Sequence, residues 1–256
     1  MWRRLRILVL LLILLIVALN TYFDRVYSTD WNIPLRATIY PINADGSPQV
    51  DRYIATLRGD RFQALESFFD SEARHYGLGL ERPIRFTAAP QLRDLPPALD
   101  RDANVLSIMG WSLRMRYWAW RTPDLPGPAP DVKLFVLYHD PNLSPTLAHS
   151  LGMQKGLYAV VNVFADNSMA GSNDVITAHE LLHTLGAIDK YDPRNSQPLH
   201  PAGYAEPDLK PLLPQTAAEL MGGRIPISAT ESAIPESLGQ VVVGTLTAEE
   251  IGWTKR

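Results

Sequence analysis

The sequence contains no cysteine in 256 residues. This absence excludes disulfide bonds, thiolate metal ligands and cysteine nucleophiles. With 46% hydrophobic and 20% charged residues, the composition is that of a globular protein. The length suits one domain of two lobes, or at most two small domains, and can bury a real core.

An excess of basic charge is also lacking. Lys and Arg number 24 against 27 Asp and Glu, which leaves a formal net charge of −3. Three of the basic residues, Arg3, Arg4 and Arg6, fall in the first six positions, so the rest of the chain carries 21 basic groups against the same 27 acidic ones. A nucleic-acid groove normally requires a basic field, and we therefore expect no nucleic-acid partner.

The apolar run at residues 7–19 is short for a membrane span. Its thirteen residues rise about 20 Å as a helix, against a hydrocarbon core of roughly 30 Å, although flanking aromatic residues and a snorkelling Arg6 lengthen the span. Residues 18–20 make a poor signal-peptidase site, so an uncleaved anchor is favoured over a cleaved signal peptide. We predict a cytoplasmic arginine cluster and a single-pass signal-anchor helix at residues 1–27, with the membrane as partner. Residues 28–256 would then lie outside the cytoplasm, in the periplasm or at the cell surface.

The body of the chain mixes strand-like and helix-like stretches. Alternation and β-branched residues predict strands at 35–40, 84–87, 132–138 and 157–164. Helical spacing predicts helices at 51–76, at 172–185 with its N-cap among the first three residues, and at 247–253 with a Thr247 cap. Residues 104–121 fit both patterns; their length favours a helix, and packed core is the favoured interpretation of their tryptophans.

Prolines set the last part of the chain apart. Eight of them lie between Pro193 and Pro235, which excludes long regular elements there. The predicted fold class is therefore α+β, in a single domain at residues 28–256. An α/β upper lobe at residues 28–186 would precede a loop-rich lower lobe at residues 187–256.

The chemistry-bearing motif is His179-Glu180-x-x-His183 on the helix predicted at 172–185. Histidines four residues apart lie on one helical face, so both imidazoles can reach one Zn²⁺. Glu180 follows the first ligand and can serve as general base toward the attacking water. Gly186 permits the left-handed turn that ends the helix, and the chain can then present Asp189 as third ligand. Ordinary histidines, a plain helix cap and a solvated turn residue are the alternative interpretation.

Other possible metal ligands lie close by in the loop-rich stretch, and spacing favours Asp189 over all of them: Asp192, His200, Glu206 and Asp208. His200 is the better zinc ligand by type. The remaining histidines have no site-like neighbours and are interpreted as structural or surface residues: His75, His139 and His149.

Residues 179–189 resemble the signature of the metzincin zinc peptidases, His-Glu-x-x-His-x-x-Gly-x-x-His/Asp, which is followed later by a Met-containing turn. An Asp in the third position is similar to the small bacterial metzincins of the snapalysin type. Residues 219–226 resemble the Met-turn, with Met221 as the hydrophobic floor of the site. The resemblance implies a metzincin-like zincin, with a mixed sheet and an active-site helix over a loop-rich C-terminal lobe. It also implies one zinc per chain.

The sequence departs from this family at the position two residues after the methionine, where larger metzincins often carry a tyrosine and this chain has Gly223. Tyr191 is our candidate for stabilising the oxyanion, with Tyr204 and Arg224 as alternatives. A cysteine switch is excluded because the chain has no cysteine.

The function predicted from these features is that of a membrane-anchored zinc endopeptidase acting on a peptide or protein substrate. The strand at 157–164 is expected to be the sheet edge along which a substrate adds as an extended strand. Two alternatives stay open. One is a zinc amide hydrolase acting on cell-wall or small peptides, and the other is a non-catalytic, metal-stabilised binding module, against which the presence of Glu180 argues.

Overall fold

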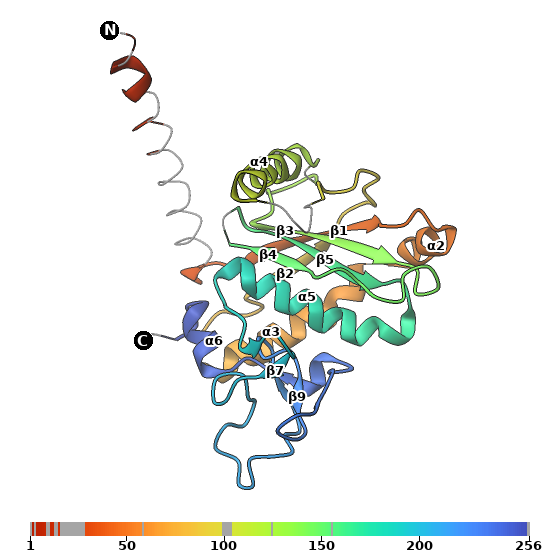
Figure 1. The fold of residues 1–256 in the computed structure, drawn as a ribbon, viewed down its shortest axis with the longest axis vertical. Helices are drawn as coiled ribbons and strands as arrows, with labels where there is room; N and C mark the ends of the chain where they lie inside the picture. Colours follow the sequence, from red (N-terminus) through yellow and green to blue (C-terminus); the bar gives the residue numbers. More distant parts are fainter. Residues whose placement is uncertain are drawn as a thin grey trace.

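The computed structural model describes residues 2, 4–8, 11–12, 15, 29–57, 59–98, 104–123, 125–154 and 156–254. Within these ranges the chain is a mixed α/β protein built around a five-stranded sheet of order β2-β1-β3-β5-β4 (Figure 1). The strands are β1 (Leu35–Asn43), β2 (Ile84–Ala88), β3 (Val132–His139), β4 (Leu151–Met153) and β5 (Tyr158–Phe164). The predicted α+β class is confirmed at this coarse level, and each of the four predicted strands is present.

The strand at 157–164 is not the edge of the sheet. β1, β2, β3 and β5 run parallel, whereas β4 pairs antiparallel outside β5, with Leu151 opposite Val160. The sequence-based prediction missed β4 because three residues are too few to show an alternating pattern. The exposed edge near the histidine helix is therefore β4.

Helices cover both faces of this sheet (Figure 1). On one face lie α2 (Pro48–Thr56), α3 (Gln63–His75) and α5 (Ala170–Leu185), and on the other lies α4 (Val105–Arg121). Neighbouring residues of one strand serve the two faces in turn, as the pleat requires. Ile39 packs in the cluster with α3 and α5, whereas Tyr40 packs in the cluster with α4.

The helix predicted at 51–76 is in fact two helices. Ser47 caps α2 by accepting a hydrogen bond from the Gln49 amide, and the chain turns extended at Leu57. A 3-10 turn, η1 (Gly59–Phe62), then leads into α3. The apolar spacing continues across this break because both helices bury one side on the same sheet, so periodicity alone did not show the interruption.

The tryptophans of α4 divide between core and surface. Trp111 is buried against the sheet together with Met115, whereas Trp120 is 77% exposed on the outer side of the helix. The preference for a helix over a strand in this stretch is confirmed. The interpretation of its tryptophans as core is right for Trp111 and wrong for Trp120.

A 3-10 turn, η2 (Asn167–Met169), comes directly before α5. After α5, the described chain contains only short elements, among them the 3-10 turn η3 (Leu238–Gln240) and the closing helix α6 (Thr245–Glu250). The remaining strands are two residues long each: β6 (Tyr191–Asp192), β7 (Gln197–Pro198), β8 (Ala218–Glu219), β9 (Ile225–Pro226), β10 (Ser232–Ala233) and β11 (Val241–Val242). The many prolines explain this irregularity, since each lacks a backbone donor. The division into two lobes at residues 186 and 187 stays a prediction.

Two predicted helix caps are wrong. Gly244, rather than Thr247, is the N-cap residue of α6, and the Thr247 hydroxyl donates to buried Glu219 instead. At the start of α5, the side chains of Ser172 and Asn173 donate to backbone carbonyls outside the helix. Tertiary contacts thus use polar residues whose local sequence resembles a cap.

The prediction of a transmembrane signal-anchor at residues 1–27 is wrong. Across the ranges that the structure describes, no helix combines the length and the apolar character that crossing a bilayer requires. The physical reason is length: the apolar run at 7–19 rises only about 20 Å as a helix, which is less than the roughly 30 Å thickness of the hydrocarbon core. Much of that run lies outside the described residues. The cytoplasmic N-terminus, the extracytoplasmic body and the membrane as partner all depended on this anchor and are withdrawn with it.

Candidate metal centre

Helix α5 holds the two predicted histidine ligands. His179 and His183 are one turn apart, with their rings 4.7 Å from centroid to centroid. The opposite side of α5 packs into the core through the fully buried Leu181, Leu182 and Leu185. Because a buried apolar side holds the helix against the sheet, its polar side presents both imidazoles in one direction.

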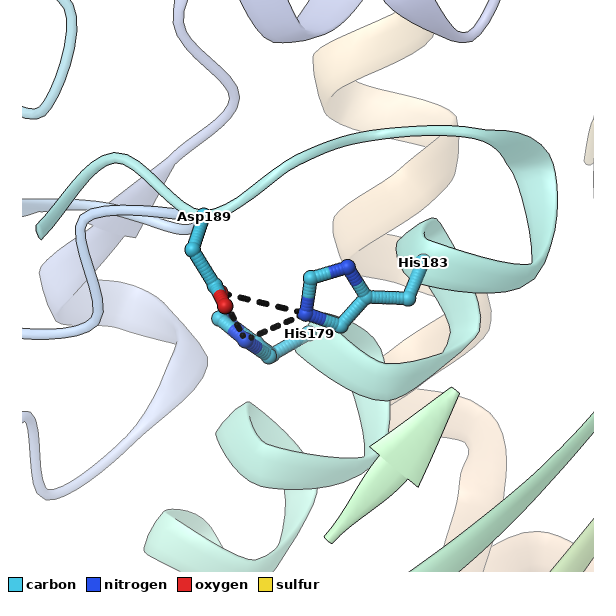
Figure 2. Close-up of side chains that lie close together, drawn as sticks. All are labelled: His179, His183 and Asp189. Carbon is cyan, nitrogen blue, oxygen red and sulfur yellow. Dashed lines mark hydrogen bonds and ion pairs between the residues drawn. The ribbon is translucent and has the colours of Figure 1, made fainter. Parts of the chain in front are cut away.

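The third predicted ligand reaches the histidines because the helix ends sharply. Gly186 has a φ of 102°, and the amides of Gly186 and Ala187 donate back to the last turn. The chain then reverses and brings Asp189 over the two rings (Figure 2). Its Oδ1 lies 3.2 Å from Nε2 of His179 and 3.1 Å from Nε2 of His183.

Backbone carbonyls define the protonation of both rings. Nδ1 of His179 lies 2.9 Å from the Leu220 carbonyl, and Nδ1 of His183 lies 2.8 Å from the Ala187 carbonyl. A carbonyl only accepts, so each Nδ1 carries a proton, and Nε2 is the ring atom that can bind a metal ion once its own proton is lost. The two Nε2 atoms are 3.1 Å apart, so the two candidate ligand atoms face one another.

This donor set fits a zinc ion. Tetrahedral ligands about 2.0–2.1 Å from zinc lie about 3.3 Å from one another, close to the three separations here. Two imidazoles and one carboxylate are ordinary zinc ligands, and all three could donate an electron pair to one ion. In the described part of the chain, His179, His183 and Asp189 are the group of three that could hold a metal ion.

The pKa values of Asp189 and His183 are shifted in opposite directions. Burial opposes ionisation of Asp189, but hydrogen bonds with the two histidines lower its pKa well below the ordinary value. Burial alone would lower the pKa of His183. The contacts with Asp189 and the Ala187 carbonyl outweigh burial, so the pKa of His183 is raised. Asp189 is therefore a carboxylate at neutral pH, as a metal ligand has to be.

Glu180 lies buried next to the ligands. The residue is 6% exposed, and its Oε2 has no hydrogen-bond partner among the described residues. Burial raises the pKa of Glu180, the charges of His179 and His183 counteract this, and the charge of Asp189 adds to it. A buried carboxylate oxygen without a partner is costly for a fold to keep.

Gly152 of the edge strand β4 is a site residue that sequence reasoning missed. A Cβ on Gly152 would lie 2.4 Å from Cβ of His183 and 2.5 Å from the carbonyl oxygen of Glu180. Only glycine permits β4 to approach the ligand helix so closely. A single glycine in a short edge strand carries no sequence signal that would have revealed this contact.

Tyr191 and Met221 both lie near the ligands. The ring of Tyr191 is 6.5 Å from that of His179, and burial followed by the Asp189 charge raises the pKa of its hydroxyl. Met221 is fully buried. It directly follows Leu220, whose carbonyl accepts a hydrogen bond from Nδ1 of His179. The functional roles assigned to Tyr191 and Met221 stay predictions.

The alternative ligands have other contacts. Asp192 pairs with Arg194 at 2.6 Å, and the His200 ring lies 3.1 Å from the Pro207 carbonyl and 5.2 Å from the ring of Tyr204. Glu206 and Asp208 are exposed. Asp189 is the candidate that lies within 3.2 Å of both Nε2 atoms, and its role as third ligand stays a prediction.

The other three histidines lie outside the cluster of ligands. His139 bonds Asn162 at 2.9 Å, and the ring of His75 packs on that of Tyr76. The His149 carbonyl accepts from the Asn162 side chain. His75 and His149 are also exposed, so these observations agree with the interpretation of the three as structural or surface residues.

No family model matches the chain, and no curated protein matches it. Among solved structures, the chain is similar to wild-type OgpA from Akkermansia muciniphila, with 11% sequence identity and a TM-score of 0.41. The likeness covers 85% of this chain and 60% of the OgpA chain, so this chain spans less than two thirds of that protein's length. At this TM-score the likeness carries no argument about function.

Proposed function

We propose that this chain is a zinc-dependent endopeptidase of the metzincin type, which hydrolyses peptide bonds in a peptide or protein substrate. The observation that carries the proposal is one cluster. Three ligand atoms converge within 3.2 Å of one another, and a buried, unpartnered Glu180 oxygen lies beside them in the described structure.

When bound, zinc would supply a Lewis acid that polarises a water and the scissile carbonyl. The protein residues do the rest. His179 and His183 keep their Nε2 lone pairs available because their Nδ1 protons are held by carbonyls. Asp189 adds one negative charge to the ligand set, which three neutral histidines would lack. Water at the site would therefore be less acidic, and its deprotonation would depend more on Glu180.

Glu180 is the proposed general base and acid. Its carboxylate accepts a proton from the attacking water and passes it to the leaving amine. Burial, the main cause of its raised pKa, brings the proton affinity of this carboxylate closer to that of the groups with which it exchanges protons. A purely structural zinc site has no use for such a base.

The edge strand β4 is the proposed platform for the substrate backbone. β4 is one of the two edge strands of the sheet, and its Gly152 lies against Glu180. A peptide that adds as an extended strand to this edge would therefore pass beside the base.

Tyr191 is the proposed oxyanion-stabilising residue. Its ring lies next to that of His179, and its hydroxyl, which is protonated at neutral pH, can donate a hydrogen bond. Tyr191→Phe should lower kcat about 10- to 1,000-fold with little change in zinc content. Unchanged turnover in this variant would remove Tyr191 from the mechanism.

The decisive experiment combines elemental analysis with hydrolysis of an unfolded protein substrate by the full chain. Wild type and Glu180→Gln should both hold about one zinc, whereas Glu180→Gln should lose about 100- to 10,000-fold in kcat/KM. Glu231 is exposed. Glu231→Gln, which makes the same substitution at that surface position, is the matched control and should keep full activity. Bound zinc without hydrolysis in wild type would point to a metal-stabilised module instead.

The ligand set has its own test in the same assay. Asp189→Ala should lose most of its zinc because one of three ligand atoms disappears, whereas Asp189→His should retain it. Asp192→Ala is the control, since that carboxylate pairs with Arg194. Equal zinc content in Asp189→Ala and wild type would remove Asp189 from the ligand set.

A further inference from the structure

The loop that carries Asp189 does not hold itself in place by side-chain burial. Ile188 is 62% exposed, and the Asp189 side chain is 42% exposed. Lys190, in contrast, is 3% exposed although lysine is rarely buried. The reason for burying this charge lies in what Lys190 contacts.

Lys190 and Glu250 form hydrogen bonds that fix the backbone on both sides of Asp189. The Lys190 ammonium donates to Glu250 Oε2 at 2.7 Å and to the Ile188 carbonyl at 3.1 Å. The same Glu250 oxygen accepts from the Ile188 amide at 3.2 Å. In addition, the Lys190 amide donates to the Met221 carbonyl at 2.8 Å. The residues before and after Asp189 are thus tied to each other and to helix α6.

A buried ion pair is a poor means of gaining stability, because desolvation consumes much of the attraction between the charges. Apolar residues of the same size would hold the core equally well. What the pair adds is direction, since charged hydrogen bonds restrict the positions of the atoms that they join. Here those atoms belong to the loop that presents the third ligand.

We propose that Lys190 and Glu250 are positioning residues that hold Asp189 at the distance zinc requires from the two histidines. The proposal rests on the proposed zinc site. It deepens that site by assigning helix α6, which lies at the far end of the sequence, a role in presenting the metal ligands.

A second contact of the same helix supports this role. Glu219 is fully buried and accepts from the Thr247 hydroxyl at 2.6 Å and from the Gly222 amide at 2.7 Å. Thr247 and Glu250 are three residues apart and therefore share one side of α6. Glu219 directly precedes Leu220, the residue whose carbonyl orients His179. Helix α6 thus reaches the Asp189 loop through Glu250 and the turn beneath His179 through Thr247.

The test removes both charges together, because removing one would leave the other buried and unpaired. In Lys190→Met/Glu250→Gln the volumes are conserved, and the glutamine still offers an oxygen to Ile188. Zinc affinity of the full chain is measured by competition with a chromophoric chelator, and the visible spectrum is recorded at saturating Co²⁺. The control is Arg36→Met/Asp131→Asn, which removes another ion pair, one that joins Arg36 of β1 to the start of β3.

The double variant should fold and bind zinc about 10- to 100-fold more weakly, as when residues behind a metal ligand are removed. Its Co²⁺ spectrum should shift from that of wild type because Asp189 no longer stays in place. The control should match wild type in both. If the double variant does not fold, Glu250→Gln alone is the second variant, because its amide oxygen can still accept a hydrogen bond from the Lys190 ammonium. It should show the same two changes.

Two contrary results are distinguishable. A variant with zinc affinity within twofold of wild type and an unchanged Co²⁺ spectrum would overturn the positioning role and leave the zinc site standing. A wild-type chain that binds neither metal would overturn the proposed function and this inference together.

Discussion

At the scale of the residue, the candidate site depends on how closely two backbones approach. Gly152 leaves no space for a side chain, because a Cβ there would overlap Cβ of His183 and the carbonyl oxygen of Glu180. Neither obstacle is the far end of a flexible side chain. Any added atom therefore has to push β4 away from α5.

We predict that Gly152→Ala destabilises the chain by about 1–3 kcal/mol, the usual cost of overpacking a filled site, and also weakens zinc binding. Urea denaturation and chelator competition measure the two effects. Gly79→Ala is the matched control, since an added Cβ there meets nothing within 4 Å. A Gly152→Ala variant as stable as Gly79→Ala would show that β4 does not press on the ligand helix.

At the scale of the element, α3 is joined to the segment before α6 by a half-buried carboxylate. Glu72 Oε2 accepts from the Val243 amide at 2.7 Å. Burial is the main cause that raises the pKa of Glu72, although the Val243 hydrogen bond and the charge of His75 counteract it. The folded protein therefore favours the protonated form more than the unfolded chain does.

This raised pKa predicts how stability depends on pH. A group whose pKa is higher in the folded state stabilises most below its unfolded pKa of about 4.3, and this contribution is lost as pH rises through the folded pKa. Between pH 4 and pH 8, wild type should lose stability relative to Glu72→Gln, which has no charge to desolvate. Urea denaturation of metal-free protein at several pH values measures the difference. A difference that stays constant or grows in favour of wild type would contradict the prediction.

At the scale of the whole molecule, the proposed ligands come from α5 and from the loop after it, and this loop contacts the Met221 turn and α6 through Lys190. A ligand that binds only the folded state stabilises it by mass action. Zinc at 100 times its dissociation constant should contribute about 2.7 kcal/mol. For a chain of this length, that raises the unfolding midpoint by roughly 5–11 °C.

Differential scanning calorimetry with zinc and with a chelator measures this shift. His183→Ala is the control, and its midpoint should be the same under both conditions because one ligand is gone. A wild-type midpoint that does not respond to zinc would show that folding does not create the site.

Some of the fold follows from the sequence because the interactions concerned are local. Residues 35–40 alternate, and residues 132–138 are rich in β-branched and aromatic side chains. Two histidines four residues apart share a helical face whatever that helix packs against. Gly186 is the residue type that ends a helix in the left-handed conformation. These features need no knowledge of distant residues.

The sequence by itself therefore determined the α+β class, the helix with His179, Glu180 and His183, and the preference for Asp189. Only the tertiary structure decided that β4 forms the edge of the sheet, that Gly152 lies against the ligand helix, and that the Leu220 carbonyl orients His179. It also decided that Lys190 and Glu250 contact the backbone next to Asp189. For β4 the physical reason is that three residues are too few to show an alternating pattern. The other contacts join residues separated by about 30 to 60 positions, and neither periodicity nor spacing records which distant segments the core brings together.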